Sequence, residues 1–232
     1  MKFVKTGLAY ALVLSGLALS SHVFAASSTT YGFVGVGDSS ASSANVTSGM
    51  SSLFVEVIDR GLAESGANQV AFKFTNASSS SLTDVYFDDG SLLGIASIDD
   101  SGPTVEFSQS ANPGNLSGGT YLDPDFVTTK GFSADSETPK PIENGVTSGE
   151  WLQIVFDLKL NQNYQSVIDA LALPNGGGEG DLRIGLRVQG FADDGGASFV
   201  NIAAPVPEAK TYAMILAGLG LIGFTVLRRR SI

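Results

Sequence analysis

Apolar and polar side chains alternate most regularly in two segments, residues 152–160 and 182–188. The first has Leu, Ile or Phe at every even position, with Gln153, Asp157 and Lys159 between them. The second has its apolar residues at even positions as well, opposite two arginines: Leu182, Ile184, Leu186 and Val188 against Arg183 and Arg187. A period of two residues is typical of a strand with one buried and one wet side. We therefore predict two strands whose even-numbered residues face a core.

Shorter alternating runs predict further strands at residues 70–75 and 84–88 and, more weakly, at 31–36, 53–58, 92–98, 104–109 and 198–202. Turn sequences such as Asp89-Gly90 and Asn144-Gly145 separate them. Many short amphipathic strands joined by Gly and Asp turns favour an antiparallel β-sandwich, jelly-roll-like or Ig-like. We expect one such domain from about Ala26 to Ile202, since about 180 residues suffice for a single core.

One helix is predicted within this β pattern, at Tyr164–Leu173. Tyr164, Val167, Ile168 and Leu171 follow helical spacing, Asn163 is a suitable N-cap and Pro174 prevents continuation. The glycine-rich residues 176–180 lack the lysine of a phosphate-binding loop and are interpreted as a connector. Residues 112–149, rich in Pro, Gly, Asn, Ser and Thr, are interpreted as variable surface loops, with a functional surface as the alternative.

The two ends of the chain differ from the middle. Residues 211–227 are uncharged and are long enough, at about 1.5 Å per residue, to form a transmembrane helix. Arg228, Arg229 and Arg230 follow and are expected to stop transfer and stay on the cytoplasmic side. At the other end, residues 1–25 have the order of a signal peptide, with Lys2 and Lys5 before an apolar stretch and a cleavage site between Ala25 and Ala26. The middle is therefore expected to be exported, by Sec-type machinery.

The C-terminal segment combines Val206-Pro207-Glu208, a short Gly- and Leu-rich span and an arginine cluster. This three-part order resembles the PEP-CTERM sorting signal, although Ala209 stands where a second proline is usual. The resemblance implies processing by an exosortase-like membrane enzyme of Gram-negative bacteria that make exopolysaccharide. It further implies transient anchoring in the inner membrane, then delivery to the outer surface or extracellular matrix. The expected organisation is a signal peptide (1–25), an exported domain (26–204) and a sorting signal (205–232).

Composition excludes several kinds of chemistry. The chain has no cysteine, and its one histidine, His22, lies in the predicted signal peptide. Ser-His-Asp and Cys-His catalysis and His-ligated zinc are therefore excluded for the exported domain. Residues 26–205 carry seven Lys or Arg and 22 Asp or Glu, a net charge of −15 against −10 for the whole chain. Such a domain repels nucleic acid, so a nucleic-acid partner is not expected.

Two features retain possible chemistry. Asp pairs at Asp88-Asp89, Asp99-Asp100 and Asp193-Asp194 resemble the oxygen-rich turns that bind calcium, but none has EF-hand spacing. We interpret them as ordinary turn residues and expect no metal or cofactor. Trp151 opens the 152–160 strand on its outer side, where its ring could stack on a sugar, with Tyr86 and Tyr121 as further aromatic candidates. The alternative is a tryptophan that only covers the edge of the sheet.

Three functions are compatible with these observations. The sequence favours a non-catalytic cell-surface or extracellular-matrix protein associated with exopolysaccharide. The second is a carbohydrate-binding module that uses Trp151. The third is a glycoside hydrolase with two catalytic carboxylates, for which the scattered aromatic residues predict no binding cleft. We therefore expect no enzymatic activity and assign no catalytic residue.

Overall fold

The computed structural model describes residues 27–37, 41–89, 94–173, 181–193 and 195–205. Its strands, in chain order, are β1 (Ser28–Gly35), β2 (Leu53–Leu62), β3 (Asn68–Asn76), β4 (Ser81–Asp89), β5 (Gly94–Asp100), β6 (Phe107–Gln109), β7 (Ser133–Ser136), β8 (Trp151–Asp157), β9 (Leu182–Gln189) and β10 (Ala197–Pro205). Its helices are α1 (Ser43–Ser52), α2 (Pro141–Asn144) and α3 (Tyr164–Leu171), with a 3₁₀ turn, η1 (Gly119–Tyr121).

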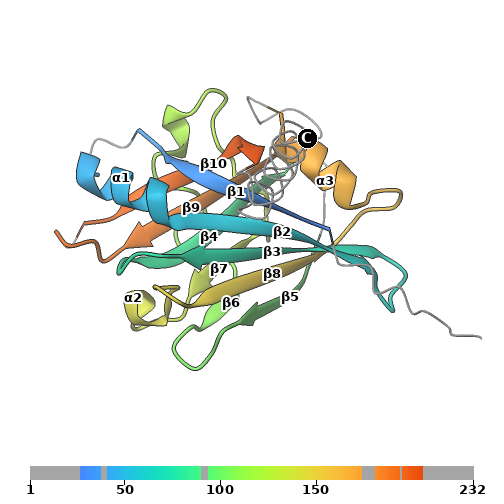
Figure 1. Cartoon of the computed structure of the whole chain (residues 1–232), viewed down its shortest axis with the longest axis horizontal. Coiled ribbons are helices and arrows are strands. Elements are labelled where there is room, and N and C mark those ends of the chain that lie inside the picture. Colours follow the sequence, from blue (N-terminus) through green and yellow to red (C-terminus); the bar gives the residue numbers. More distant parts are fainter. Residues whose placement is uncertain (1–26, 38–40, 90–93, 174–180, 194, 206–232) are drawn as a thin grey trace, which may run out of the picture.

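All ten strands belong to one antiparallel sheet, in the order β5-β8-β3-β2-β1-β10-β9-β4-β7-β6. The sheet curls until its two edge strands, β5 and β6, come within 8 Å of each other between Cα atoms, so the shape is nearly that of a barrel (Figure 1). The prediction of an antiparallel β fold is confirmed. The expected sandwich of two separate sheets is not what the pairing shows, because β1 and β10 join the two facing halves into one sheet.

Aromatic side chains from the two facing halves meet inside the curled sheet. The ring of Phe87 on β4 lies 5.1 Å from Phe72 on β3 and 4.7 Å from Phe156 on β8, between centroids and edge to face. Such pairs contribute about 0.5–1.5 kcal/mol beyond the area that they bury. The even-numbered residues of β9 are buried as well. The inward faces predicted from alternation in these strands are therefore correct.

The predicted strand at residues 152–160 continues past the actual end of β8. Leu160 was expected to face the core, but its side chain is 89% exposed. The strand ends at Asp157, and Leu158 is the last buried residue before the chain turns. Asn161 adopts a positive φ of 68° in this turn. Once the chain leaves the strand, residue parity no longer decides which side a residue faces.

The predicted helix is confirmed as α3, which ends two residues earlier than expected. Asn163 caps it: its Oδ1 accepts a hydrogen bond from the Ser166 amide at 3.1 Å, and the Ser166 side chain returns the contact. Val167 and Leu171 pack into the core. Helices α1 and α2 were not predicted. Helix α1 also begins with a cap, since Ser42 Oγ accepts from the Asn45 amide.

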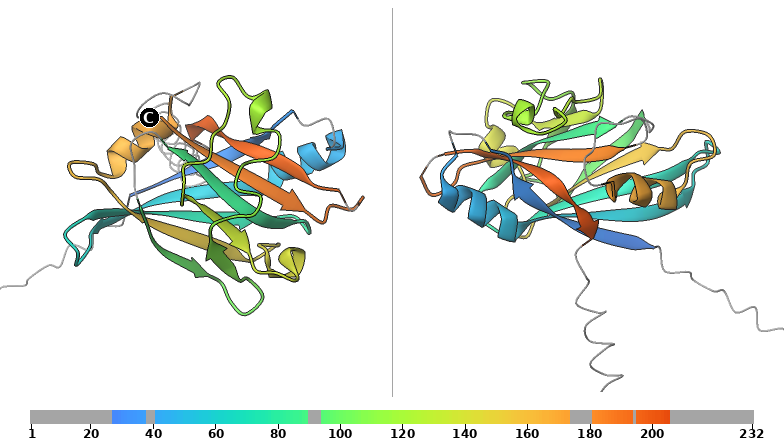
Figure 2. Two further views of the ribbon diagram at one scale, coloured as in Figure 1. Left: turned by 180° about the vertical axis from the view of Figure 1, so that it is seen from behind. Right: turned by 90° about the horizontal axis from the view of Figure 1, so that it is seen from above.

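Residues 110–127, here called the covering segment, lie across the outer face of β4, β9 and β10 (Figure 2). Leu116 and Phe126 in this segment are each 4% exposed and form a second buried cluster with Tyr86 and Val200. Gly185 makes this possible, because a Cβ there would lie only 2.9 Å from Leu116 Cδ2. This part of residues 112–149, interpreted as surface loops, is largely irregular, but its buried side chains make it the lid of a second core, and β7 and α2 also lie in that range.

The start of β1 and the end of β10 lie at the same end of the sheet. Ser28, which opens β1, pairs with Ile58, and Pro205, which closes β10, pairs with Tyr31. Within the described ranges, none of the helices is both long and apolar enough to cross a membrane. The predicted signal peptide, the cleavage site at Ala25 and Ala26, the glycine-rich connector and the apolar run 211–227 lie outside the described residues.

Candidate functional site

Trp151 lies at the start of β8 beside a shallow groove of about 300 Å³. Both backbone groups of Trp151 are bonded to Ser101, after β5: its carbonyl accepts from the Ser101 amide at 3.0 Å, and its amide donates to Ser101 Oγ at 3.2 Å. The side chain is half-buried, and the Lys73 ammonium sits over the indole, 5.1 Å from its centroid. Hydroxyl, amide and carboxylate groups complete the groove: Thr75, Asn76, Ser148 and Glu150.

Glu150 is the acidic residue of this groove and is held by its neighbours. Its Oε2 accepts hydrogen bonds from the Thr147 amide at 2.8 Å and from the Thr147 hydroxyl at 2.7 Å, while Oε1 accepts from Thr104 Oγ1. Partial burial alone would raise the pKa of Glu150, but these hydrogen bonds outweigh it and the pKa is lowered. A carboxyl group held in its ionised form is unsuited to act as a general acid.

The two tyrosines suggested as partners of Trp151 do not join it. Tyr86 is completely buried beneath the covering segment, where its hydroxyl lies 3.1 Å from Asp84 Oδ1 and 3.0 Å from the Pro113 carbonyl. Tyr121 is 65% exposed, but it belongs to η1 in the covering segment and does not line the Trp151 groove. The residue that sequence reasoning missed is Lys73. Its position opposite Gln153 follows from the β3–β8 register, which the sequence alone does not supply.

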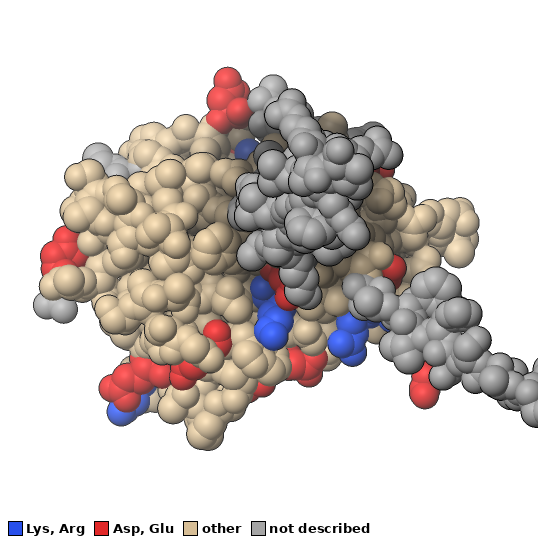
Figure 3. Space-filling model, in the orientation of Figure 1, with Lys and Arg blue, Asp and Glu red and all other residues tan. Residues whose placement is uncertain are grey.

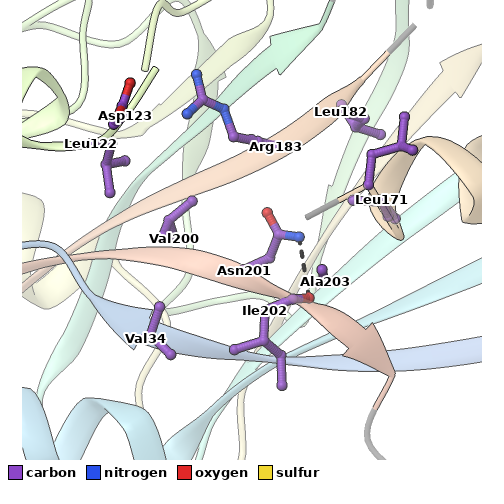
Figure 4. Close-up of a pocket in the computed structure, with 11 residues that line it drawn as sticks. Val34, Leu122, Asp123, Leu171, Leu182, Arg183, Val200, Asn201, Ile202 and Ala203 are labelled. Atoms are coloured by element: carbon purple, nitrogen blue, oxygen red, sulfur yellow. Dashed lines mark hydrogen bonds between the residues drawn. The ribbon is translucent and has the colours of Figure 1, made fainter. Parts of the chain in front are cut away.

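A second groove, also of about 300 Å³, runs along the outer face of β10 towards Pro205 (Figure 4). Apolar side chains dominate it: Val34, Leu122, Leu171, Leu173, Leu182, Val200 and Ile202. Two of its polar side chains are already engaged. Asn201 Oδ1 accepts from the Ile184 amide at 2.7 Å, and Arg183 bonds Asp88.

Arg183 fastens the covering segment to the sheet. Its guanidinium pairs with the Asp88 carboxylate and donates to the Pro124 carbonyl at 2.7 Å and the Asp125 carbonyl at 2.6 Å. It also lies 5.3 Å from the Phe126 ring centroid. Arg183 therefore pairs with an acidic neighbour, and its contacts assign it a structural role.

One residue of each Asp pair forms a hydrogen bond or ion pair within the protein. Asp88 forms an ion pair with Arg183. Asp100 Oδ1 accepts from the Gly102 amide at 2.8 Å, and Asp193 Oδ1 accepts from Asn45 Nδ2 at 2.7 Å. Among the described residues, no three His, Cys, Asp or Glu side chains gather in a way that could hold a metal ion. On the face that Figure 3 shows, the acidic side chains lie mainly towards the rim rather than in one cluster.

Asp84 and Asp135 make a carboxyl pair, with Asp84 buried and Asp135 partly exposed, that sequence reasoning missed. They stand directly opposite each other on β4 and β7, and Asp84 is 3% exposed. Burial raises the pKa of Asp84 to about 6, helped by the charge of Asp135 and opposed by hydrogen bonds from Thr83 and Tyr86. Burial also raises the pKa of Asp135. Burial closes Asp84 to a large substrate, whereas Asp135 is partly exposed beside the covering segment, and its Oδ2 accepts from the Asn112 amide at 3.2 Å.

Comparison with known proteins gives one match, at the C-terminal end. Residues 205–230 match the model of the PEP-CTERM protein-sorting motif. No curated protein and no solved structure matches the chain. The match begins at Pro205, the last residue of β10, so the motif follows the described sheet without an intervening residue. The predicted motif residues Val206, Pro207 and Glu208 and the arginines 228–230 lie within or at the end of the matched range, outside the described residues.

This motif implies export, membrane-associated sorting and processing by an exosortase-like membrane enzyme. The chain is therefore a PEP-CTERM domain-containing protein, in which a curled antiparallel β sheet precedes the sorting motif.

Proposed function

We propose that this chain is a non-catalytic cell-surface or extracellular-matrix protein, delivered by exosortase-dependent sorting and associated with exopolysaccharide. The observation that carries the proposal is the position of the sorting motif, which starts on the final residue of the sheet. The folded sheet is then the domain that is delivered, and the motif is the signal that directs its sorting.

The two grooves support a role without catalysis. The β10 groove is mainly apolar, and Arg183 and Asn201 in it are bonded to the protein itself. In the Trp151 groove, Glu150 is kept ionised by its neighbours. A glycosidase needs a general acid and a second carboxylate on either side of an accessible bond. Asp84 and Asp135 both have raised pKa values, but Asp84 is buried, so the two carboxyl groups are not both accessible to a substrate.

Association with exopolysaccharide can be tested by location. The processed protein should sediment with the cell-bound matrix in a strain that makes exopolysaccharide and should appear in the medium of an isogenic strain that does not. Equal distribution in both strains would remove exopolysaccharide from the proposal while leaving sorting intact.

The Trp151 groove supports carbohydrate binding as a second candidate function. A half-exposed indole beside hydroxyl groups and an ammonium can contact both the apolar face and the hydroxyl groups of a sugar. Trp151→Ala should weaken binding to any glycan-array ligand by about tenfold or more, as loss of an aromatic anchor does. Tyr121→Ala removes an exposed aromatic outside the groove and should leave binding unchanged. Equal effects of the two changes would place the sugar elsewhere.

A further inference from the structure

A short link limits how far the end of β10, and with it one end of the sheet, can lie from the membrane. Only residues 206–210 separate Pro205 on β10 from the apolar run 211–227. Six steps between Cα atoms, at about 3.3–3.6 Å each, give a reach of about 20 Å. While the apolar run is held in the bilayer, this end of the sheet must therefore stay close to the membrane surface.

The same end carries the two most exposed large hydrophobic side chains of the described residues. Leu160 is 89% exposed in the loop after β8, and Leu62 is 71% exposed at the end of β2. Leu173, 47% exposed, follows α3 at this end as well. Figure 1 shows the β2–β3 hairpin and α3 on one side of the molecule and α1 and α2 on the other.

Hydrogen bonds and a buried neighbour fix the loop that presents Leu160. The Leu158 amide donates to the Asn68 carbonyl at 2.7 Å, and Asn68 Nδ2 donates to the Gln162 carbonyl at 2.8 Å. These contacts tie the loop to the start of β3, while Leu158 itself is buried at 6% exposure. The positive φ of Asn161 then turns the chain back directly after Leu160. The exposure of Leu160 is thus set by the fold.

The charges of this end also differ from those of the rest of the domain. Residues 59–67 and 158–162, here called the leucine tip, contain two cations, Arg60 and Lys159, and two anions, Asp59 and Glu64. Their charges cancel, whereas residues 26–205 together carry −15. Bacterial phospholipid bilayers are anionic, so the neutral leucine tip can approach them with less repulsion than an average part of this surface.

We propose that the leucine tip rests on the exported side of the phospholipid bilayer while the chain awaits processing, with Leu62 and Leu160 inserted into the interface. Apolar side chains with adjacent cations are suited to this boundary region. Docking holds the sheet in one orientation and keeps residues 206–210 at a fixed height above the bilayer. The proposal depends on the sorting motif and is independent of the role of exopolysaccharide.

The lack of cysteine makes a direct test possible, because a single introduced cysteine is labelled uniquely. The full chain carrying Leu62→Cys or Leu160→Cys, labelled with a polarity-sensitive fluorophore, is reconstituted in phosphatidylethanolamine–phosphatidylglycerol vesicles that contain a spin-labelled lipid. Met50→Cys and Ile142→Cys place the same label on partly exposed residues at the opposite end. Labels at positions 62 and 160 should show blue-shifted emission and strong quenching, and labels at 50 and 142 neither. Equal quenching at all four positions would overturn the proposal.

A second variant separates docking from simple tethering. In the Leu160→Asp background, the label at position 62 should lose most of its quenching, because a carboxylate resists entry into the interface. Leu160→Ser should give a smaller loss. Since residue 160 is almost fully exposed, both variants should unfold at the parent temperature, which shows that the fold is intact. Unchanged quenching in Leu160→Asp would mean that the tether alone sets the position, and the proposed docking would be wrong.

Discussion

Asp84 and Asp135 stand opposite each other on β4 and β7, with Asp84 buried and Asp135 partly exposed. Tyr86, Thr83 and Arg187 are the other polar or charged groups acting on Asp84. The pKa of Asp84 is about 6 in the folded protein against an ordinary 3.8. The folded state therefore holds a proton that the unfolded chain releases, and stability must fall as pH rises from about 4 through about 6. The raised pKa of Asp135 acts in the same direction.

This pair predicts a protein that is more stable at pH 5 than at pH 7.5. Between these two pH values, a folded-state pKa of about 6 against an ordinary 3.8 corresponds to a difference on the order of 1–1.5 kcal/mol in the free energy of unfolding. The lowered pKa of Glu150 has the opposite sign, but its contribution is complete above its ordinary value of 4.5 and so is constant over this range. Thermal unfolding of the full chain in detergent at the two pH values measures the effect.

Asp84→Asn is the matched control: the titration is lost, while the amide oxygen can accept from one of the Thr83 and Tyr86 hydroxyls and the amide NH2 can donate to the other hydroxyl oxygen. The variant should lose most of the pH dependence and be more stable than the parent at pH 7.5. The assignment would fail if the variant kept the parent's full dependence on pH.

Among the helices, α1 shows how tertiary contacts override a local preference. Replacing glycine by alanine inside a helix normally stabilises by about 0.5–1 kcal/mol. At Gly49 a Cβ would lie 2.1 Å from Phe199 Cζ, deep in the contact between α1 and β10. Gly49→Ala should therefore destabilise, by about 1–3 kcal/mol, as overpacking does. Ser51→Ala, at an exposed position of the same helix, should change stability by less than about 0.5 kcal/mol.

Urea unfolding of Gly49→Ala and Ser51→Ala measures both changes in the free energy of unfolding. A stabilised Gly49→Ala would show that Phe199 moves aside and that α1 is packed loosely.

The same elements show what the sequence could predict. The inward side chains of β8 and β9 are apolar and alternate with mostly polar outward ones, so a period of two appears in the chain and predicts the inward faces correctly, although the covering segment also buries part of the outer face of β9. Helix α3 has a cap and four spaced apolar residues, and was found for that reason. Helix α1, in which four of the ten residues are serine, packs closely at Gly49, which has no side chain, and gives no apolar period.

Long-range contacts account for what was missed. Leu116 and Phe126 look like scattered apolar residues in a polar segment, and only the cavity left by Gly185 shows where they pack. Lys73 comes beside Trp151 through the register of two strands far apart in the sequence. The carboxyl pair depends on the pairing of β4 with β7 in the same way. The sorting motif was found because it is a contiguous pattern that needs no tertiary contact.

For the whole molecule, the decisive relation is that of the sheet to the motif that begins at Pro205. The fold provides a compact, acidic cargo, and residues 206–210 are the short link between the sheet and the apolar run. Pro207 restricts this link, because proline fixes its own φ and disfavours helix at the residue before it. We expect an extended link, accessible to an enzyme at the membrane surface.

The most direct test of this account is the mass and location of the product after Pro207-Glu208→Ala-Ala in a host with an exosortase. The parent should be found outside the inner membrane with the mass of a chain cut near Val206-Pro207-Glu208. The variant should be exported but remain in the inner membrane with its C-terminal segment attached, as the parent should in a host without the enzyme. A variant that reaches the surface with the parent's mass and yield would contradict processing at this motif and leave the tail as a simple anchor.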